Sequence, residues 1–318
     1  MSTVLVIGGA GYVGSHACKA LAAAGFRPVV YDDLSTGHRW AAKWGPLEAG
    51  DLRDATHLTA VLQRWRPAAV MHFAAQALVG RSVAEPALTW SINRDGTAAL
   101  IAALATQGNL PVVFSSTCSL YGESVAALLD ESLPPAPTNP YAASKRAAEE
   151  LLEAAPLRSV RLRYFNAAGA DPEGELGEVH EPETHLIPNV LKAVLDGPPL
   201  FVHGTDYPTP DGTCLRDYVH VSDLAAAHLA ALRHLLAGGA SATLNLGSGE
   251  AASVLQVIAT AERVTGRPVP WRTGPRRPGD PARLVADCSR AAALLGWRPQ
   301  RSQLETIIAD AWQWHRRR

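Results

Sequence analysis

The sequence predicts an α/β protein with a doubly wound parallel sheet and a smaller, loop-rich α/β lobe for substrate. Two observations lead to this class. In the first half of the chain, short apolar runs alternate with Ala- and Leu-rich segments of helical spacing, which favours parallel strands covered by helices on both faces. After about Asn166, glycine and proline become frequent, and this change predicts the loop-rich second lobe.

Composition limits the classes of function. The chain has 318 residues, of which 47% are hydrophobic, enough for a large core. Its 29 basic and 30 acidic residues nearly cancel, so we expect neither nucleic acid nor a membrane as a partner. The four cysteines lack CxxC spacing, which predicts no disulfide framework and no metal site. No leader and no membrane-spanning run is recognised, so we expect a cytoplasmic protein.

Five apolar runs are predicted to form the strands of the large lobe. Each is short, rich in β-branched or apolar residues, and bounded by turn formers. They cover residues 3–9, 26–33, 68–75, 110–117 and 159–166, and a further short strand is expected before Gly50. Residues 226–239 and 305–318 are predicted to be structural helices, the first ended by glycines and the second basic at its C-terminal end.

A glycine-rich turn follows the first predicted strand and opens the first helix. Gly8, Gly11 and Gly14 allow a tight turn, a close approach of the backbone to a pyrophosphate, and close packing of helix on strand. The N-terminus of the helix offers free N–H groups to phosphates. The motif therefore predicts a dinucleotide site on a Rossmann-type sheet.

Acidic residues indicate which dinucleotide is bound. The second strand ends in Tyr31-Asp32-Asp33, and a carboxylate there accepts hydrogen bonds from the ribose hydroxyls and repels a 2′-phosphate. NAD is therefore predicted rather than NADP, with Asp51 and Leu52 at its adenine edge. We assign residues 1–166, with a return segment near 216–237, to NAD binding, and residues 167–318 to the loop-rich second lobe.

Tyr141 and Lys145 lie one turn apart at the start of a predicted helix. Asn139 is suited to cap that helix and Pro140 to its first position, and the four-residue spacing corresponds to a rise of about 6 Å. For tyrosine to act as a base near neutral pH, its pKa must fall by about three units, or about 4 kcal/mol. Lys145 alone is marginal for this shift, whereas an added positive nicotinamide ring makes it feasible. The alternative is an ordinary i,i+4 surface pair.

These residues carry a resemblance to the extended short-chain dehydrogenase/reductase family and, within it, to the UDP-sugar 4-epimerases. The glycine motif, the Thr117 hydroxyl after an apolar strand and the Tyr141-x-x-x-Lys145 pair are shared. The likeness extends over essentially the whole chain, through the segments GGAGYVGSH, DDLSTG, GDLRD, HFAA, SINRDGT, RYFNAAGAD, DYPTPDGTCLRDYVHVSDLA, LNLGSG and RRPGD, which stand in the order of the family.

The resemblance implies the roles of individual residues. Tyr141 is the base, Lys145 lowers its pKa and holds the nicotinamide ribose, and Thr117 hydrogen-bonds the sugar hydroxyl. The implied cofactor-binding residues are Gly8, Gly11, Tyr12, Val13, Gly14, Asp32, Asp33, Asp51, Leu52, Phe73, Ala74, Ala75, Asn93, Ser115, Tyr141, Lys145 and Tyr164. The implied substrate-binding residues are Thr117, Asn166, His185, Leu186, Phe201, Arg216, Arg277, Asp280 and Leu284. A homodimer is implied as well, and the helices expected at 94–107 and 144–155 are candidates for its interface.

The implied reaction is NAD-dependent epimerisation at C4 of a UDP-sugar through a transient 4-keto form. UDP-glucose and UDP-galactose are the expected pair, while N-acetylhexosamine, pentose and uronate substrates stay open. Ala77 and His185 depart from residues that some members have, lysine and asparagine respectively. A 4,6-dehydratase is disfavoured, because Cys118 and Ser119 stand where that class has an acid and a base. A non-catalytic NAD or nucleotide-sugar sensor is disfavoured by the intact Thr117, Tyr141 and Lys145.

Overall fold

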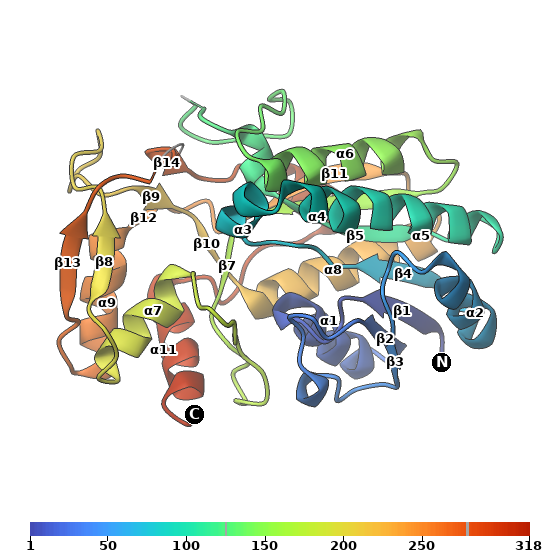
Figure 1. The fold of residues 1–318 in the computed structure, drawn as a ribbon, viewed down its shortest axis with the longest axis horizontal. Coiled ribbons are helices and arrows are strands. Elements are labelled where there is room, and N and C mark those ends of the chain that lie inside the picture. Colours follow the sequence, from blue (N-terminus) through green and yellow to red (C-terminus); the bar gives the residue numbers. More distant parts are fainter. Residues whose placement is uncertain (125, 278–279) are drawn as a thin grey trace.

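The computed structural model describes residues 1–124, 126–277 and 280–318. A seven-stranded, fully parallel sheet with helices on both faces forms the larger lobe (Figure 1), which confirms the predicted α/β class. Across the sheet the strands run β11 (Ala242–Leu246), β6 (Ser159–Tyr164), β5 (Val112–Thr117), β4 (Ala69–His72), β1 (Thr3–Ile7), β2 (Arg27–Asp32) and β3 (Leu47–Ala49).

The residues of β1 alternate between the two faces of the sheet. Val4 and Val6 pack in one hydrophobic cluster with residues of α1 (Tyr12–Ala23) and α8 (Val221–Leu236), whereas Leu5 and Ile7 pack in another. The second cluster contains residues of α2 (Ala55–Trp65), α5 (Gly96–Ala105) and α6 (Pro140–Ala154). Figure 1 shows α1 and α8 on one side of the sheet and α5 and α6 on the other. A strand buried on both faces reads as a continuous apolar run, which is why the predicted strands lacked alternation.

The chain returns to the large lobe after it has entered the second one. Helix α8 packs against α1, and β11 then pairs with β6, with Leu246 opposite Tyr164. The return segment expected near 216–237 therefore extends to Leu246 in the structure. The open edge of β6 explains the extension, since its backbone groups need a partner strand.

The second lobe is built around α7 (Leu186–Val194), α9 (Val254–Thr265) and α11 (Leu304–His315), which share one hydrophobic cluster. Figure 1 shows these helices grouped beside the parallel pair of β8 and β13. Its short strands are β7 (Asn166–Ala168), β8 (Leu200–His203), β9 (Leu215–Arg216), β10 (Tyr218–His220), β12 (Ala252–Ser253), β13 (Trp271–Gly274) and β14 (Arg283–Leu284). The remaining helices are α3 (Val79–Ala84), α4 (Pro86–Trp90) and α10 (Ser289–Leu295).

Among the described residues, none of the helices combines the length and the apolar character that crossing a membrane requires.

Candidate active site

A cavity of about 570 Å³ opens at the carboxyl ends of the parallel strands. The ends of β1, β2, β4, β5 and β6 supply one wall, and residues 177–180 and 185–188 with Tyr218 supply the facing wall. Ligands of open α/β sheets bind at this edge, where the strand order reverses direction. The position of the cavity between β1 and β4 at that edge is therefore the one expected for a dinucleotide.

The glycines of the first turn divide into two kinds. A Cβ on Gly8, whose φ is +77°, would lie 2.5 Å from the Ala74 nitrogen, and one on Gly14 would lie 2.1 Å from the Gly8 oxygen. Packing within the protein therefore requires both. A Cβ on Gly11 would meet only the Gly8 oxygen, at 3.4 Å, and Gly11 lines the cavity. The space beside Gly11 fits the close approach of a pyrophosphate, so the turn is suited to hold NAD.

Asp32 is fixed in the wall of the cavity. One carboxylate oxygen accepts a hydrogen bond from the Ala10 N–H and the other from the Leu34 N–H, both at 2.9 Å. The side chain is nearly buried and lines the cavity. Each oxygen keeps a lone pair for a further donor, so the carboxylate is oriented for the hydroxyls of a ribose.

Most residues expected to contact the cofactor line this cavity. These are Gly8, Gly11, Tyr12, Val13, Gly14, Asp32, Asp33, Asp51, Leu52, Phe73, Ala74, Ala75, Ser115, Tyr141, Lys145 and Tyr164. Asn93 differs, since it lies buried behind the wall. Its side chain accepts from the Gln76 N–H and donates to the Gln76 carbonyl and the Ser144 hydroxyl. These bonds hold the Gln76 backbone in place and leave one lone pair on the Asn93 amide oxygen, so a contact of Asn93 with the cofactor stays a prediction.

Helix α6 begins as the sequence predicted. The Asn139 side chain accepts a hydrogen bond of 2.9 Å from the Ala142 N–H, and Pro140 occupies the first turn. This start places Tyr141 and Lys145 in the cavity wall together with Thr117 at the end of β5. The Lys145 ammonium lies 4.1 Å from the centre of the Phe114 ring. The geometry favours a shared site over a surface pair, because Lys145 is 2% exposed.

Burial governs the electrostatics of this pair. It raises the pKa of the Tyr141 phenol well above its ordinary value, and a hydrogen bond with Thr117 acts in the opposite direction. Burial also lowers the pKa of the Lys145 ammonium to about 7, against the attraction of the Glu149 carboxylate. The protein groups alone therefore do not make Tyr141 a base, and a second positive charge is needed, as an oxidised nicotinamide would provide.

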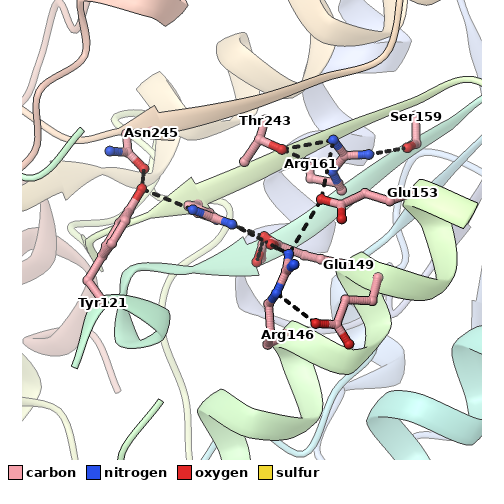
Figure 2. Close-up of polar contacts among 11 residues, drawn as sticks. Tyr121, Arg146, Glu149, Glu153, Ser159, Arg161, Thr243 and Asn245 are labelled. Atoms are coloured by element: carbon pink, nitrogen blue, oxygen red, sulfur yellow. Dashed lines mark hydrogen bonds and ion pairs between the residues drawn. The ribbon is translucent and has the colours of Figure 1, made fainter. Parts of the chain in front are cut away.

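A buried ionic network supports the helix from behind (Figure 2). The Glu149 carboxylate accepts hydrogen bonds from the Arg163 guanidinium at 2.9 and 2.6 Å and from the Ser116 hydroxyl at 2.6 Å. Arg163 also donates to the Tyr121 hydroxyl, which in turn donates to the Asn245 side chain. The network thus links α6 to β5, β6 and β11.

Glu149 is the residue that the sequence analysis missed. It follows Lys145 by four residues, so it continues the one-turn spacing that had identified Tyr141 and Lys145. A glutamate one turn beyond the lysine, together with an arginine at position 163 inside a predicted strand, was the available signal.

The expected substrate residues fall into three groups. Thr117, Asn166, His185 and Leu186 line the cavity. Leu284 does not line the cavity and is buried in a small cluster with Cys118 and Phe165. Arg216, Arg277, Asp280 and Phe201 are not among the residues that line it.

Two of the residues that do not line the cavity, Arg216 and Asp280, are paired with each other. The Arg216 guanidinium is bound to the Asp280 carboxylate and to the Leu215 carbonyl. Phe201, on β8, is 57% exposed and stands opposite Arg272 of β13 in the parallel pair. The two middle residues of the RRPGD segment, 278 and 279, lie outside the described residues.

A glycine turn, a fixed acidic residue and a Thr–Tyr–Lys group on a doubly wound sheet define a dinucleotide-dependent enzyme that moves hydrogen at a hydroxyl-bearing carbon. The chain belongs to the NAD dependent epimerase/dehydratase family, whose model matches residues 4–247.

Three relatives illustrate the similarity. A UDP-glucose 4-epimerase of Rhizobium meliloti is 50% identical over 100% of this chain and 98% of its own length. The crystal structure of UDP-glucose 4-epimerase from Brucella ovis in complex with NAD is 46% identical, with a TM-score of 0.95 over 98% of both chains. The UDP-Glc/GlcNAc 4-epimerase of Campylobacter jejuni is 35% identical, with a TM-score of 0.87 over 100% of both chains.

Proposed function

We propose that this enzyme interconverts UDP-glucose and UDP-galactose by inverting the configuration at C4 of the sugar. One observation carries the proposal: Thr117, Tyr141 and Lys145 line the same cavity as the glycine turn on one side and Asn166, His185 and Leu186 on the other. A dinucleotide held by the first set and a nucleotide sugar held by the second would meet at the Thr–Tyr–Lys group. The relatives named UDP-glucose 4-epimerase support the choice of substrate.

In the proposed reaction, the Tyr141 phenolate takes the proton of the sugar 4-hydroxyl while Thr117 holds that oxygen by a hydrogen bond. The glycine turn and Asp32 would hold NAD⁺, which would supply the redox chemistry by taking up a hydride from C4 and returning it. The resulting 4-keto sugar turns its other face toward the site before the return, and Tyr141 gives the proton back. Lys145 keeps a positive charge beside Tyr141 in the step that forms the phenolate.

The two lobes have separate tasks in this proposal. Residues 1–166 with the return segment bind NAD, and residues 167–318 bind the nucleotide sugar. His185 and Leu186, at the start of α7, hold the diphosphate half. Arg216 and Arg277 complete that grip, since a guanidinium fork matches paired phosphate oxygens, and Asp280 positions Arg216 through their ion pair.

We further propose a cytoplasmic homodimer. The four cysteines are all unpaired, as in a reducing compartment, and α5 and α6 carry partly exposed Ala and Leu side chains suited to a helix-to-helix contact. Light scattering of the purified protein tests the assembly, for which twice the mass of one chain is expected. A monomer at micromolar concentration contradicts it.

The decisive experiment is incubation with each nucleotide sugar, followed by chromatographic separation of the products. UDP-glucose and UDP-galactose should each yield the same equilibrium mixture, without accumulation of a 4-keto product. Accumulation of that ketone would identify a dehydratase, and the absence of any conversion would identify a sensor. Conversion of a UDP-N-acetylhexosamine, UDP-pentose or UDP-uronate, without conversion of UDP-glucose or UDP-galactose, would identify a 4-epimerase of a different sugar.

A further inference from the structure

Two histidines and two glutamates meet at the rim of the cavity. They are Glu178, His180, Glu183 and His185, and one donor atom of each lies within 4.8 Å of the others. His180 Nδ1 stands 3.1 Å from Glu178 Oε1 and 3.8 Å from Glu183 Oε1. His185 Nδ1 contacts the same Glu178 oxygen. The cluster brings four metal-ligating side chains from eight residues of one segment to a single point.

The two carboxylates of this cluster are buried without a permanent cation. The side chains of Glu178 and Glu183 are each 2% exposed. In the described part of the chain, no lysine or arginine forms an ion pair with either of them. Buried negative charges of this kind need a compensating positive charge. Imidazoles supply it only while they are protonated, whereas a divalent cation supplies it permanently.

His180 adds a second, independent observation. Its Nδ1 atom is buried and makes no hydrogen bond to any described residue, although two carboxylate oxygens stand near it. Donors around a tetrahedral zinc ion, at about 2.0–2.2 Å from the metal, stand about 3.3 Å apart. His180 Nδ1 lies 3.1 Å from Glu178 Oε1 and 3.8 Å from Glu183 Oε1, and these two distances lie on either side of that value.

A neighbouring cluster shows the opposite case. Asp171, Glu173 and Glu175 also converge, but Lys19 Nζ lies 2.9, 2.6 and 2.7 Å from their carboxylates. A lysine already neutralises these acids, and two of them are well exposed. This cluster needs no metal ion and provides a matched control in the same stretch of chain.

We propose that Glu178, His180, Glu183 and His185 bind one divalent cation of the zinc type. Imidazole and carboxylate ligands together select zinc, cobalt or nickel over magnesium and calcium. The His185 side chain is 52% exposed, which gives the ion a path of entry. The metal would use His185 Nδ1 and leave its Nε2 for a ligand in the cavity. The ion would fix residues 178–185 against the start of α7, and this inference stands independently of the proposed reaction.

Cobalt titration tests the site directly. NAD-loaded protein without added histidines is treated with a chelator, dialysed and titrated with Co²⁺, then with Zn²⁺. We expect one Co²⁺ per chain, with the strong visible bands of a four-coordinate ion, loss of these bands on addition of Zn²⁺, and release of protons as the imidazoles become ligands. Weak bands typical of the hydrated ion, or no saturation at one equivalent, would overturn the proposal.

Variants assign the binding to these residues. His180→Gln and Glu183→Gln should each weaken Co²⁺ binding about tenfold or more, while Glu173→Gln in the neighbouring cluster should leave it unchanged. Bound NAD and the circular dichroism spectrum establish that each variant is folded. Unchanged affinity in both ligand variants, or an equal loss in Glu173→Gln, contradicts the assignment, and the stoichiometry of the wild-type protein tests the site even where a variant does not fold.

Discussion

The Ser116 hydroxyl donates a hydrogen bond of 2.6 Å to the Glu149 carboxylate and thereby joins β5 to α6 directly behind the candidate active site. Ser116 precedes Thr117, and Glu149 lies one turn beyond Lys145. Through Arg163 the same carboxylate reaches β6, next to Tyr164. One buried acid therefore joins β5 and α6, which carry the proposed catalytic residues, and ties both of them to β6.

Glu149→Gln should lower kcat and stability while leaving KM for the nucleotide sugar nearly unchanged. The amide keeps the shape but leaves the Arg163 charge buried without its partner, which typically costs about 3–5 kcal/mol. Steady-state kinetics and urea unfolding measure both effects. Glu150→Gln is the matched control, since Glu150 is 58% exposed and also pairs with Arg146. Equal effects of the two substitutions would show that Glu149 has no special position.

Tyr141→Phe should lower kcat by about 10²–10⁴-fold, because it removes the group proposed to take the proton of the 4-hydroxyl. The phenyl ring fills the same space, so affinity for UDP and the content of NAD should stay as in wild type. Calorimetric titration with UDP provides the control. Retention of more than about a tenth of wild-type kcat would assign the base to another residue.

Lys145→Met should abolish activity and stabilise the NAD-free protein at pH 6 by about 1–4 kcal/mol, because a buried charge is replaced by an apolar side chain of similar length. The pKa of Lys145 is about 7 in the folded protein and about 10.4 in the unfolded chain. Between these values the folded state binds fewer protons, so wild-type stability rises with pH. The advantage of the variant should shrink from pH 7 to pH 10.

Urea unfolding at several pH values measures this trend. His72 and Glu149 are the titratable groups whose charges interact with that of Lys145. Burial holds the pKa of His72 at about 3, so it stays neutral throughout the range. Lys192→Met, at an exposed position of α7, should show no such dependence. A constant difference between Lys145→Met and wild type would contradict the lowered pKa.

Gly11→Ala and Gly14→Ala should separate cofactor binding from folding. The added methyl group at Gly11 meets no protein atom closer than 3.4 Å, whereas at Gly14 it lies 2.1 Å from the Gly8 oxygen. Gly11→Ala should therefore keep the stability of the NAD-free protein and lower its NAD affinity at least tenfold, by analogy with other lost close contacts. Gly14→Ala should lower stability by about 1–3 kcal/mol. NAD released on denaturation and the melting temperature distinguish the two, and full NAD binding by Gly11→Ala would disprove the pyrophosphate contact.

Leu284→Tyr should suppress epimerisation of UDP-N-acetylglucosamine more than that of UDP-glucose. Leu284 packs with Cys118 and Phe165, and by family resemblance a larger residue at this position restricts the sugar. One such change is worth about 1–3 kcal/mol of discrimination, measured as the ratio of kcat/KM values. Absence of N-acetylated turnover in wild type, or equal losses for both sugars, would remove this role from Leu284.

The sequence predicted the cofactor half of the site well because short-range geometry determines it. Gly8, Gly11 and Gly14 lie within one turn, and Asp32 ends a strand that must lie beside β1. Asn93, which the family resemblance assigns to the cofactor, also binds Gln76 and Ser144 in the structure, and nothing in the sequence indicated these bonds. The order of the family motifs placed Asn93 near the cofactor, but it did not predict which groups its side chain would bind.

The second lobe was harder to predict because distant segments build it. Leu284 joins the cluster of Cys118 and Phe165 only after β14 pairs with β9, at the register of Leu284 with Arg216. The convergence of Glu178 with His185 depends on the path of an irregular loop, which has no periodic signature. Cysteine spacing was the only metal signal in the sequence analysis, and histidine–glutamate sites of this kind lack such a regular spacing.

The late position of β11 has a consequence for synthesis on the ribosome. When β6 leaves the exit tunnel, its partner strand is still untranslated, and the apolar edge formed by Val160 and Leu162 stays open until residues 242–246 follow. An open edge of this kind can pair with another nascent chain. The polypeptide between these strands includes most of the second lobe, so the sheet closes only after the ribosome has released the segment that carries His185 and Arg216. We therefore expect a chain that ends before Ala242 to be prone to aggregation rather than to form an independent cofactor-binding protein.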